Sequence, residues 1–210
     1  MKILELFAGT RSIGKAFENK GHDVFSIDWD TKFEKIDLYT DISILTSKDI
    51  IALFGKPDII WASPDCTTYS ISAISHHRTK DLDGNLTPKS DYAKFCDNAN
   101  INLIKLINEL NPKYFFIENP RGGFRKMNFI KEIDRHTISY CQYGDNRMKP
   151  TDIFTNHKNP NFKHICKKGS PCHISAPRGS KTGTQGLKGS VERSRIPDLF
   201  CQHIVEISEK

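Results

Sequence analysis

The sequence predicts an α/β protein built on a doubly wound parallel sheet, with a small loop-rich insert before a closing helix. Short apolar runs alternate with longer amphipathic segments over the first two-thirds of the chain, an order typical of strand–helix–strand units. This regular pattern stops near residue 156 and returns at residue 196. The length of 210 residues suits one domain around one core.

Four short apolar runs predict the strands, because each is rich in β-branched or aromatic side chains and is bounded by polar or turn residues. The expected strands span residues 2–7, 23–27, 57–62 and 113–117.

Three segments show the periodicity of helices. Residues 12–20 begin with a serine that can cap a helix, and residues 91–110 repeat apolar side chains at three- and four-residue steps. Residues 196–207 show similar spacing and predict a helix that packs back on the sheet. The expected division of the chain is a core over residues 1–155, an insert over 156–193 and a closing helix within 194–210.

The composition excludes several classes of protein. No run approaches the roughly 18 consecutive apolar residues that a membrane span needs, and the first ten residues lack the pattern of a signal peptide. Six cysteines spread over a chain of this length do not form a dense disulfide framework. We therefore expect free thiols in a reducing compartment and no membrane partner.

Charge is divided unevenly along the chain. Residues 1–120 carry 14 Lys and Arg against 17 Asp and Glu, whereas residues 121–200 carry 16 against 6. A basic region attached to a mildly acidic one suggests that one part of the molecule meets a polyanion such as nucleic acid. A solvated basic face is the alternative, and charge alone does not separate the two.

The residues after the predicted strands are the first candidates for a ligand site, because ligands of such sheets bind beyond the carboxyl ends of the strands. Phe7, Gly9 and Thr10 lie in a turn that lets backbone amides approach a ligand. The turn lacks the GxGxxG pattern of dinucleotide folds, and the sequence lacks a Walker lysine pattern, which disfavours NAD and ATP. Asp28 can accept hydrogen bonds from ribose hydroxyls, and Trp29 offers a flat surface for a base. A surface carboxylate and a half-buried indole are the alternative interpretation.

Two further strand ends carry reactive side chains. Cys66 lies in a polar turn, where a nucleophile is more typical than a structural cysteine. Glu118 emerges from an apolar strand, and partial burial there raises the pKa of a carboxyl group toward the range of a proton donor. We expect both side chains to meet over one ligand.

Taken together, these segments resemble a known family. The runs LELFAGTRSIG, SIDWD, SPDCTTYS and FFIENP follow the order and spacing of the motifs of C5 cytosine DNA methyltransferases. DNRMK at residues 145–149 and SRIPDLFCQHIVEI near the end extend the resemblance, which covers about residues 2–155 and 194–207. It implies a Rossmann-like, S-adenosylmethionine-dependent methyltransferase fold.

The resemblance also implies roles for individual residues. Cys66 corresponds to the nucleophile, and Glu118 to the glutamate that engages N3 and the exocyclic amine of a flipped cytosine. Arg147 and Lys149 fall where the family has arginines that orient the base and the catalytic loop. The residues implied to bind S-adenosylmethionine are Phe7, Gly9, Thr10, Asp28, Trp29, Asp41, Ile42 and Pro64.

Several positions depart from the family pattern. Arg11 replaces a glycine, so its side chain must point away from the cofactor or contact the cofactor's carboxylate. Asp65 replaces a proline beside Cys66, and its charge is expected to raise the pKa of the thiol. Asp145 and Lys149 replace a glutamine and an arginine. A catalytically inactive, DNA-binding relative is therefore an alternative.

Sequence recognition would have to come from a short insert, since only about 45 residues separate DNRMK from the closing helix. We expect Arg178, Lys181 and Lys188 of its basic, glycine-rich stretch to contact DNA phosphates, as does Ser70 in the loop of Cys66. A flexible linker is the alternative for that stretch. The polar residues 67–88 predict a mobile lid that closes over DNA. Within it, residues 76–78, which end in Arg78, are expected either to contact phosphates or to be solvated.

The insert also holds four side chains that can bind a metal. They are His164, Cys166, Cys172 and His173. A Cys-x5-Cys pair followed directly by histidine is not a usual finger spacing, so the sequence predicts no metal site and leaves zinc as the alternative. Cys141 is expected to be a small core residue.

The function predicted from the sequence is methyl transfer from S-adenosylmethionine to C5 of cytosine in double-stranded DNA, through a covalent adduct between Cys66 and C6 of a flipped base. An RNA cytosine-5 methyltransferase is the main alternative. The expected setting is a monomer in the cytoplasm of a prokaryotic or phage-infected cell, with a cognate restriction nuclease as a conceivable partner.

Overall fold

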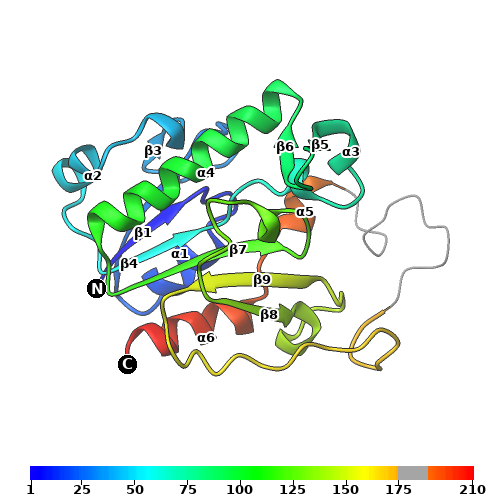
Figure 1. Ribbon diagram of the computed structural model, residues 1–210. Coiled ribbons are helices and arrows are strands. Elements are labelled where there is room, and N and C mark those ends of the chain that lie inside the picture. Colours follow the sequence, from blue (N-terminus) through cyan, green and yellow to red (C-terminus); the bar gives the residue numbers. More distant parts are fainter. Residues whose placement is uncertain (175–188) are drawn as a thin grey trace.

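A seven-stranded sheet forms the centre of the computed structural model, which describes residues 1–174 and 189–210 (Figure 1). The strand order is β3-β2-β1-β4-β7-β9-β8. The strands are β1 (Lys2–Leu6), β2 (Asp23–Asp28), β3 (Leu38–Tyr39), β4 (Ile59–Ala62), β7 (Tyr114–Pro120), β8 (Arg135–Ser139) and β9 (Pro150–Thr155).

The sheet is parallel except at β9. The four strands expected from the sequence, β1, β2, β4 and β7, are confirmed and lie side by side in parallel. β9 runs antiparallel to both of its neighbours, β7 and β8. β8 and β9 can pair in this way because only residues 140–149 connect them, too few for a parallel crossover.

Helices cover both faces of the sheet, as a doubly wound fold requires. Figure 1 shows α4 on one face and α6 on the other. Leu4 and Leu6 pack with α4 and α2, whereas Ile3 packs with α1 and α6, because alternate residues of a strand face opposite ways. The helices are α1 (Ser12–Glu18), α2 (Ser47–Leu53), α4 (Asp91–Leu110) and α6 (Asp198–Ser208).

Helix boundaries follow local capping chemistry. α4 spans the expected residues, because the Ser90 side chain accepts a hydrogen bond from the Ala93 amide (3.1 Å) and Asn111 adopts a left-handed conformation at the other end. The closing helix begins two residues later than expected, because Pro197 occupies its N-cap. The first helix ends two residues early, at Glu18.

Residues 67–88 are more regular than the expected loop. They form η2 (Thr67–Tyr69), α3 (Ile74–His77) and a hairpin of β5 (Arg78–Lys80) and β6 (Leu86–Pro88). Arg78 is buried in this hairpin, so the expectation that it contacts phosphates or solvent is wrong.

The segment after β9 is the least regular part of the described chain. Residues 156–174 contain neither helix nor strand, and α5 (Ser190–Ser194) precedes the closing helix. The remaining short helices are η1 (Ile42–Ile44), η3 (Phe124–Lys126) and η4 (Tyr140–Tyr143). Among the described residues, none of the helices combines the length and apolar character needed to cross a membrane.

Candidate active site

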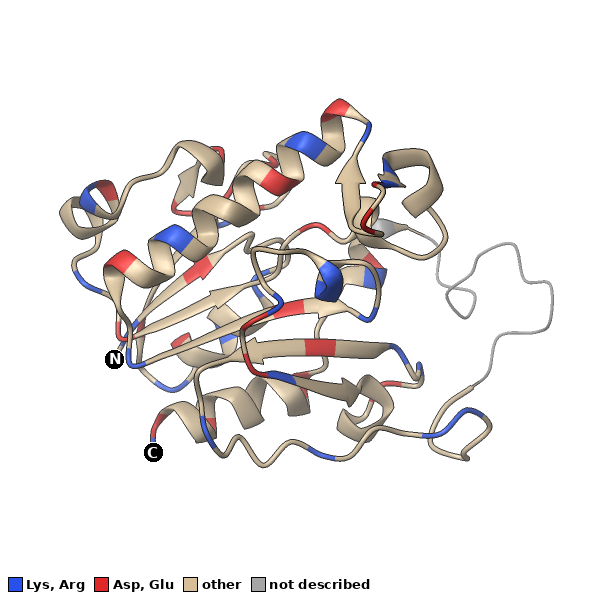
Figure 2. Cartoon of the chain, viewed as in Figure 1, with Lys and Arg blue, Asp and Glu red and all other residues tan. Residues whose placement is uncertain are grey.

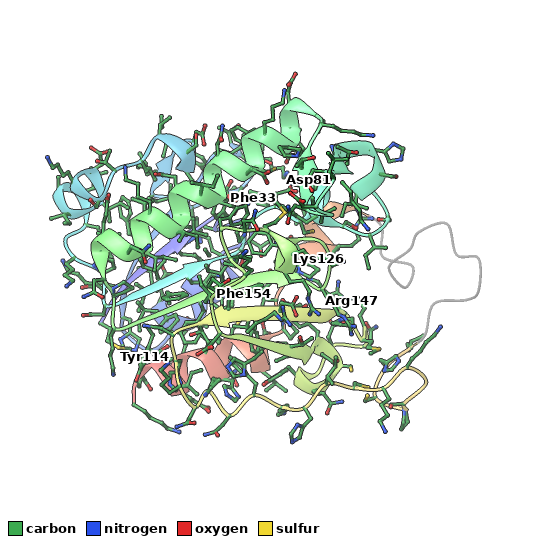
Figure 3. All side chains as sticks on the ribbon, viewed as in Figure 1. Phe33, Asp81, Tyr114, Lys126, Arg147 and Phe154 are labelled. Carbon is green, nitrogen blue, oxygen red and sulfur yellow. The ribbon has the colours of Figure 1, made fainter. Side chains whose placement is uncertain are left out.

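The candidate site lies at the carboxyl ends of four adjacent parallel strands, β2, β1, β4 and β7. Asp28, Cys66 and Glu118 each lie at or just after the end of one of these strands. Arg147 lies near the start of β9, which pairs antiparallel with β7 and therefore begins at the same edge of the sheet (Figure 3). The sheet thus brings residues from distant parts of the sequence to one edge. We call this edge the strand-end site.

The turn after β1 is held in an unusual backbone conformation. Phe7, Gly9 and Arg11 all have positive φ angles, of 53°, 51° and 54°. Such angles are strained for the side chains of phenylalanine and arginine, and strained backbone clusters at functional sites. The Gly9 amide donates a hydrogen bond to Oδ2 of Asp28 (2.8 Å), so the turn is tied to the end of β2.

Arg11 turns away from the strand-end site into the protein. Its Nε donates to Oγ of Ser26 (2.8 Å), and its guanidinium pairs with Glu18 beside the buried Glu5. Burial raises the pKa of Glu5 to about 7. Of the two orientations expected for Arg11, the structure has the one pointing inward.

Asp28 is buried, and both of its carboxylate oxygens accept backbone hydrogen bonds. Oδ2 accepts from Gly9, and Oδ1 accepts from the Asp30 amide (2.9 Å). Burial raises the pKa of Asp28. Each oxygen has a second lone pair, so the carboxylate keeps acceptor capacity for a ligand hydroxyl.

A pocket lies between the strand ends and α4. The predicted residues Phe7, Trp29 and Pro64 line it together with Asp65. Its other lining residues, which the sequence analysis missed, come from one face of α4: Tyr92, Phe95, Cys96, Ala99 and Asn100. The sequence offered one signal for them, because two aromatic residues stand close together at the start of this helix.

Two features of the pocket suit a ligand with an aromatic base. Trp29 is 46% exposed and meets Phe95 edge to face, with ring centroids 5.8 Å apart. The side-chain oxygen of Asn100 is buried and has no hydrogen-bond partner among the described residues. A buried acceptor without a hydrogen bond raises the free energy of the folded protein, so a hydrogen-bond donor on a ligand would bind favourably there.

Other predicted cofactor residues lie outside the pocket lining. The side chain of Asp41 accepts hydrogen bonds from the amide and hydroxyl of Ser43 at the start of η1. Ile42 is buried against α4, whose Asn102 donates to the Ile42 carbonyl (2.7 Å). The hydroxyl of Thr10 lies 2.9 Å from that of Ser12. The pocket therefore does not bring these residues together with Trp29.

The Cys66 loop is anchored through its backbone. Asn119, next to Glu118, donates to the Pro64 carbonyl (3.0 Å), and the Asp65 side chain accepts from the Thr67 amide (2.6 Å). Burial raises the pKa of the Cys66 thiol to about 11, with further contributions from the charges of Asp65 and Glu118. The thiol form therefore predominates at neutral pH.

Arg78 anchors the same loop from its other side. Its Nε donates to the Thr68 carbonyl (2.9 Å), and Nη2 donates to the Thr68 hydroxyl (3.0 Å) and to Asp97 of α4 (2.7 Å). The Tyr69 hydroxyl also donates to Asp97, and its ring lies under the guanidinium. This buried network joins the loop to α4.

Glu118 is buried at the end of β7 beside Cys66. The Tyr140 hydroxyl donates a hydrogen bond to its Oε1 (2.8 Å). Burial raises the pKa of Glu118, whereas the positive charge of Lys149 and the Tyr140 hydrogen bond oppose the rise. The pKa of Glu118 is thus raised, as expected from the sequence.

Arg147 and Lys149 lie close together, and both donate to the Arg193 carbonyl, Arg147 through Nη1 at 3.4 Å. Arg147 is buried and pairs with Asp145. Lys149 has a positive φ of 28°, its ammonium lies over the Tyr140 ring, and it donates to the Arg193 carbonyl (3.0 Å). Burial lowers the pKa of Lys149.

The residues predicted to contact DNA lie partly within and partly outside the described residues. Ser70 is half-buried in the Cys66 loop, with its hydroxyl 3.0 Å from that of Ser72. Arg178, Lys181 and Lys188 lie outside the described residues.

The four potential metal ligands of the insert do not form one group. Cys166, Cys172 and His173 gather with Cys141, while the exposed His164 lies outside this cluster, so its assignment as a ligand is wrong. Cys141 is buried as expected of a core residue, but its sulfur faces two other sulfurs.

Comparison with known proteins connects this geometry to a family. The sequence model of C-5 cytosine-specific DNA methylases matches residues 1–139, which include Asp28, Cys66 and Glu118 and stop before Arg147. A protein of Frog virus 3 (isolate Goorha), named probable DNA (cytosine-5)-methyltransferase, is 28% identical over 230 residues. That alignment covers 99% of this chain and 100% of the viral protein.

Solved structures share the fold at low sequence identity. The S. pombe Dnmt2 methyltransferase superposes with a TM-score of 0.52 at 18% identity, over 74% of this chain and 48% of that one. A putative DNA modification methyltransferase of an E. coli prophage gives 0.53 at 16% identity, over 74% and 46%. The Entamoeba histolytica methyltransferase EhMeth gives 0.55 at 18% identity, over 80% and 57%. The chain thus spans about half the length of these structural relatives but the full length of the viral one.

Proposed function

The chain belongs to the C-5 cytosine-specific DNA methylases, and from this premise we propose that it methylates C5 of cytosine in DNA, using S-adenosylmethionine and a covalent adduct with Cys66. The observation that carries the proposal is the juxtaposition of Cys66 and Glu118. Cys66 follows β4, and Glu118 lies near the carboxyl end of the neighbouring parallel strand β7. The negative charge of Glu118 contributes to the raised pKa of the Cys66 thiol. A nucleophile and a proton donor at adjacent strand ends suit attack on C6 of a cytosine.

The neighbouring pocket supports the binding of S-adenosylmethionine. Trp29 and Phe95 provide apolar surface for an adenine, and Asp28 keeps acceptor capacity for ribose hydroxyls. The unpaired oxygen of Asn100 offers a further acceptor. When bound, S-adenosylmethionine supplies an electrophilic methyl group. In this proposal Asp41, Ile42 and Thr10 support the pocket from outside its lining.

The chain's own residues would carry the chemistry on cytosine. The Cys66 thiolate adds to C6 and forms a C–S bond, while Glu118 donates a proton to N3, so that C5 becomes nucleophilic. After C5 has accepted the methyl group, water takes the C5 proton and the C–S bond breaks with its electron pair going to sulfur, so the aromatic ring is restored and Cys66 leaves as the thiolate. N3 returns its proton at the same stage, which leaves Cys66 and Glu118 as they began.

The charges around Cys66 set a condition on this mechanism. Because the pKa of the thiol is about 11, a substrate must help to create the thiolate. Protonation of Glu118 removes one of the two negative charges that disfavour the thiolate, and the charge of Lys149 favours it. A cytosine whose N3 accepts a hydrogen bond from protonated Glu118 would keep this carboxyl neutral before the proton is transferred, and would thereby favour the thiolate when the correct base is bound.

The proposal is tested by incubating the protein with S-adenosylmethionine and, in separate reactions, unmethylated genomic DNA and total RNA. Digestion to nucleosides and mass spectrometry then quantify 5-methylcytosine in each polymer. We expect new 5-methyldeoxycytidine that depends on Cys66. Product only in RNA would overturn the assignment of DNA, and cofactor binding without any product would favour an inactive DNA-binding relative. A monomeric state, a cytoplasmic location, a flipped base and a partner nuclease stay predictions.

A further inference from the structure

Three cysteines and a histidine form a compact cluster. It lies next to the edge strand β8, whereas Cys66 follows the central strand β4. Cys141 comes from η4, whereas Cys166, Cys172 and His173 come from residues 156–174. One ligand atom of each residue lies within 4.8 Å of all the others. The Sγ atoms of Cys166 and Cys172 are 3.1 Å apart, and those of Cys172 and Cys141 are 3.6 Å apart.

The histidine completes the cluster through one ring nitrogen. Nδ1 of His173 lies 3.5 Å from Sγ of Cys166 and 3.6 Å from Sγ of Cys172. A tetrahedral zinc ion, with Zn–S of about 2.3 Å and Zn–N of about 2.0 Å, would separate two sulfurs by about 3.8 Å and a sulfur from a nitrogen by about 3.5 Å. The distance between the sulfurs of Cys172 and Cys141 and both sulfur–nitrogen distances are close to these values, whereas the sulfurs of Cys166 and Cys172 would have to move apart to hold the ion.

We propose that Cys141, Cys166, Cys172 and His173 bind one structural zinc ion that fastens residues 156–174 to the catalytic domain. Three thiolates and an imidazole are the soft and borderline ligands that zinc prefers over magnesium or calcium. All four positions come from the protein, so the ion keeps no open position for a substrate. The role is structural rather than catalytic.

The 156–174 segment needs such a fastening. Of its residues only Pro160 and Cys166 are buried, and it contains neither helix nor strand. A segment with so little buried apolar surface does not order itself, and a structural metal supplies the missing free energy. Gln142 of η4 adds a polar contact to the cluster, because its Nε2 lies 3.4 Å from Sγ of Cys172 and can donate to a thiolate.

A disulfide between Cys166 and Cys172 is the competing chemistry. Their sulfurs lie about 1 Å beyond the S–S bond length of about 2.05 Å. A disulfide would also leave Cys141 and His173 without a reason to face the pair. The whole arrangement of four ligand atoms favours the metal.

The first test is the metal content of the full-length wild-type protein. The protein is expressed in zinc-supplemented medium and dialysed against metal-free buffer. Inductively coupled plasma mass spectrometry should then find about one zinc ion per chain. Replacement of zinc by Co²⁺ should produce the charge-transfer and d–d absorption of a tetrahedral thiolate site. Absence of both zinc and a Co²⁺ spectrum would overturn the proposal, as would a Cys166–Cys172 disulfide in the freshly purified protein.

Matched variants locate the ion. Cys141→Ser and His173→Ala should reduce bound zinc from about one per chain to near zero, whereas His164→Ala and Cys201→Ala, which lie outside the cluster, should leave it unchanged. Full zinc content in Cys141→Ser would refute this ligand set. Circular dichroism reports whether each variant folds, and if one does not, the Co²⁺ spectrum of the wild-type protein decides.

Discussion

The strand-end site and the 156–174 segment are held in place by different means. Residues of the strand-end site follow regular strands, and buried side chains such as Asn119 and Arg78 fix the Cys66 loop. The 156–174 segment packs one aromatic ring, that of Phe162, against Phe200 of α6. Elsewhere it is held by hydrogen bonds, for example from the Cys166 amide to Oγ of Ser139 (2.9 Å) and from the Ile174 amide to the Asn146 carbonyl (2.8 Å). Catalytic positioning comes from the sheet, whereas the segment depends on cross-links.

The two regions also differ in charge. Figure 2 shows only blue positions along the 156–174 segment, which carries Lys158, Lys163, Lys167 and Lys168 and no acidic residue. The strand-end site instead concentrates carboxylates, among them Asp28, Asp65 and Glu118. A basic segment suits contact with phosphates, and a site that needs proton transfer suits buried carboxyl groups.

Removal of the nucleophile should have the largest effect on the strand-end site and none on the 156–174 segment. Cys66→Ala is expected to lower methyl transfer by at least about 10³-fold, because the adduct with C6 needs the Cys66 thiol and the other thiol nearby, Cys96, lies on α4 in the pocket lining. Binding of S-adenosylmethionine, measured by calorimetry, and zinc content should both persist. Turnover retained in Cys66→Ala would contradict the proposed mechanism. The converse variant, Cys172→Ser, should lose zinc and keep Cys66 reactive.

Arg78 tests whether the buried network positions the Cys66 loop. Arg78→Met should destabilise the protein by about 3–5 kcal/mol, since it leaves the buried Asp97 without its charged partner. Arg78→Lys keeps a positive charge but loses the paired hydrogen bonds to Thr68, so kcat should fall roughly tenfold. Urea unfolding and steady-state kinetics measure the two effects. An unchanged kcat in a folded Arg78→Lys would limit Arg78 to a structural role, and Lys80→Met, on the exposed side of the hairpin, is the control.

Asp28 tests the cofactor half of the strand-end site. Asp28→Ala should weaken S-adenosylmethionine binding by about 10- to 100-fold, the range expected for lost hydrogen bonds to a charged group. Calorimetric titration gives the dissociation constant. Asp30→Ala removes a neighbouring carboxylate that pairs with Lys32 and should leave the affinity unchanged. Equal affinity in Asp28→Ala and the wild-type protein would show that the cofactor binds elsewhere.

The smallest effect concerns the pKa of Cys66. Below a pKa of about 11 the thiolate fraction, and with it the alkylation rate, should rise about tenfold per pH unit from pH 7 to pH 10. Asp65→Asn removes a negative charge but keeps the oxygen that accepts from Thr67, so it should lower this pKa and speed alkylation at pH 8 by about 3- to 10-fold. Peptide mass spectrometry after timed iodoacetamide treatment isolates Cys66 from the other thiols. Asp91→Asn, an exposed control, should have no effect, and slower alkylation of Asp65→Asn would reverse the assigned sign.

Much of the strand-end site could be predicted from the sequence because its residues directly follow apolar strands. Cys66 and Glu118 were found in this way, and the neighbouring strands bring them to one edge of the sheet. The aromatic wall of the pocket was missed, although Tyr92 and Phe95 stand together at the start of a predicted helix, because helical periodicity does not show which strand ends that part of the helix faces. Arg78 was misjudged for a related reason, because polar neighbours hid its buried partner, Asp97.

The sequence by itself determined four of the seven strands of the sheet, three of the helices and the family, because apolar patterns and ordered motifs are local properties of the chain. Only the tertiary structure decided which distant side chains meet. It turned Arg11 inward to Ser26, and it brought Cys141 to Cys166 and Cys172 while leaving His164 aside. Those outcomes depend on loop closure between residues far apart in sequence, and spacing along the chain carries no record of that closure.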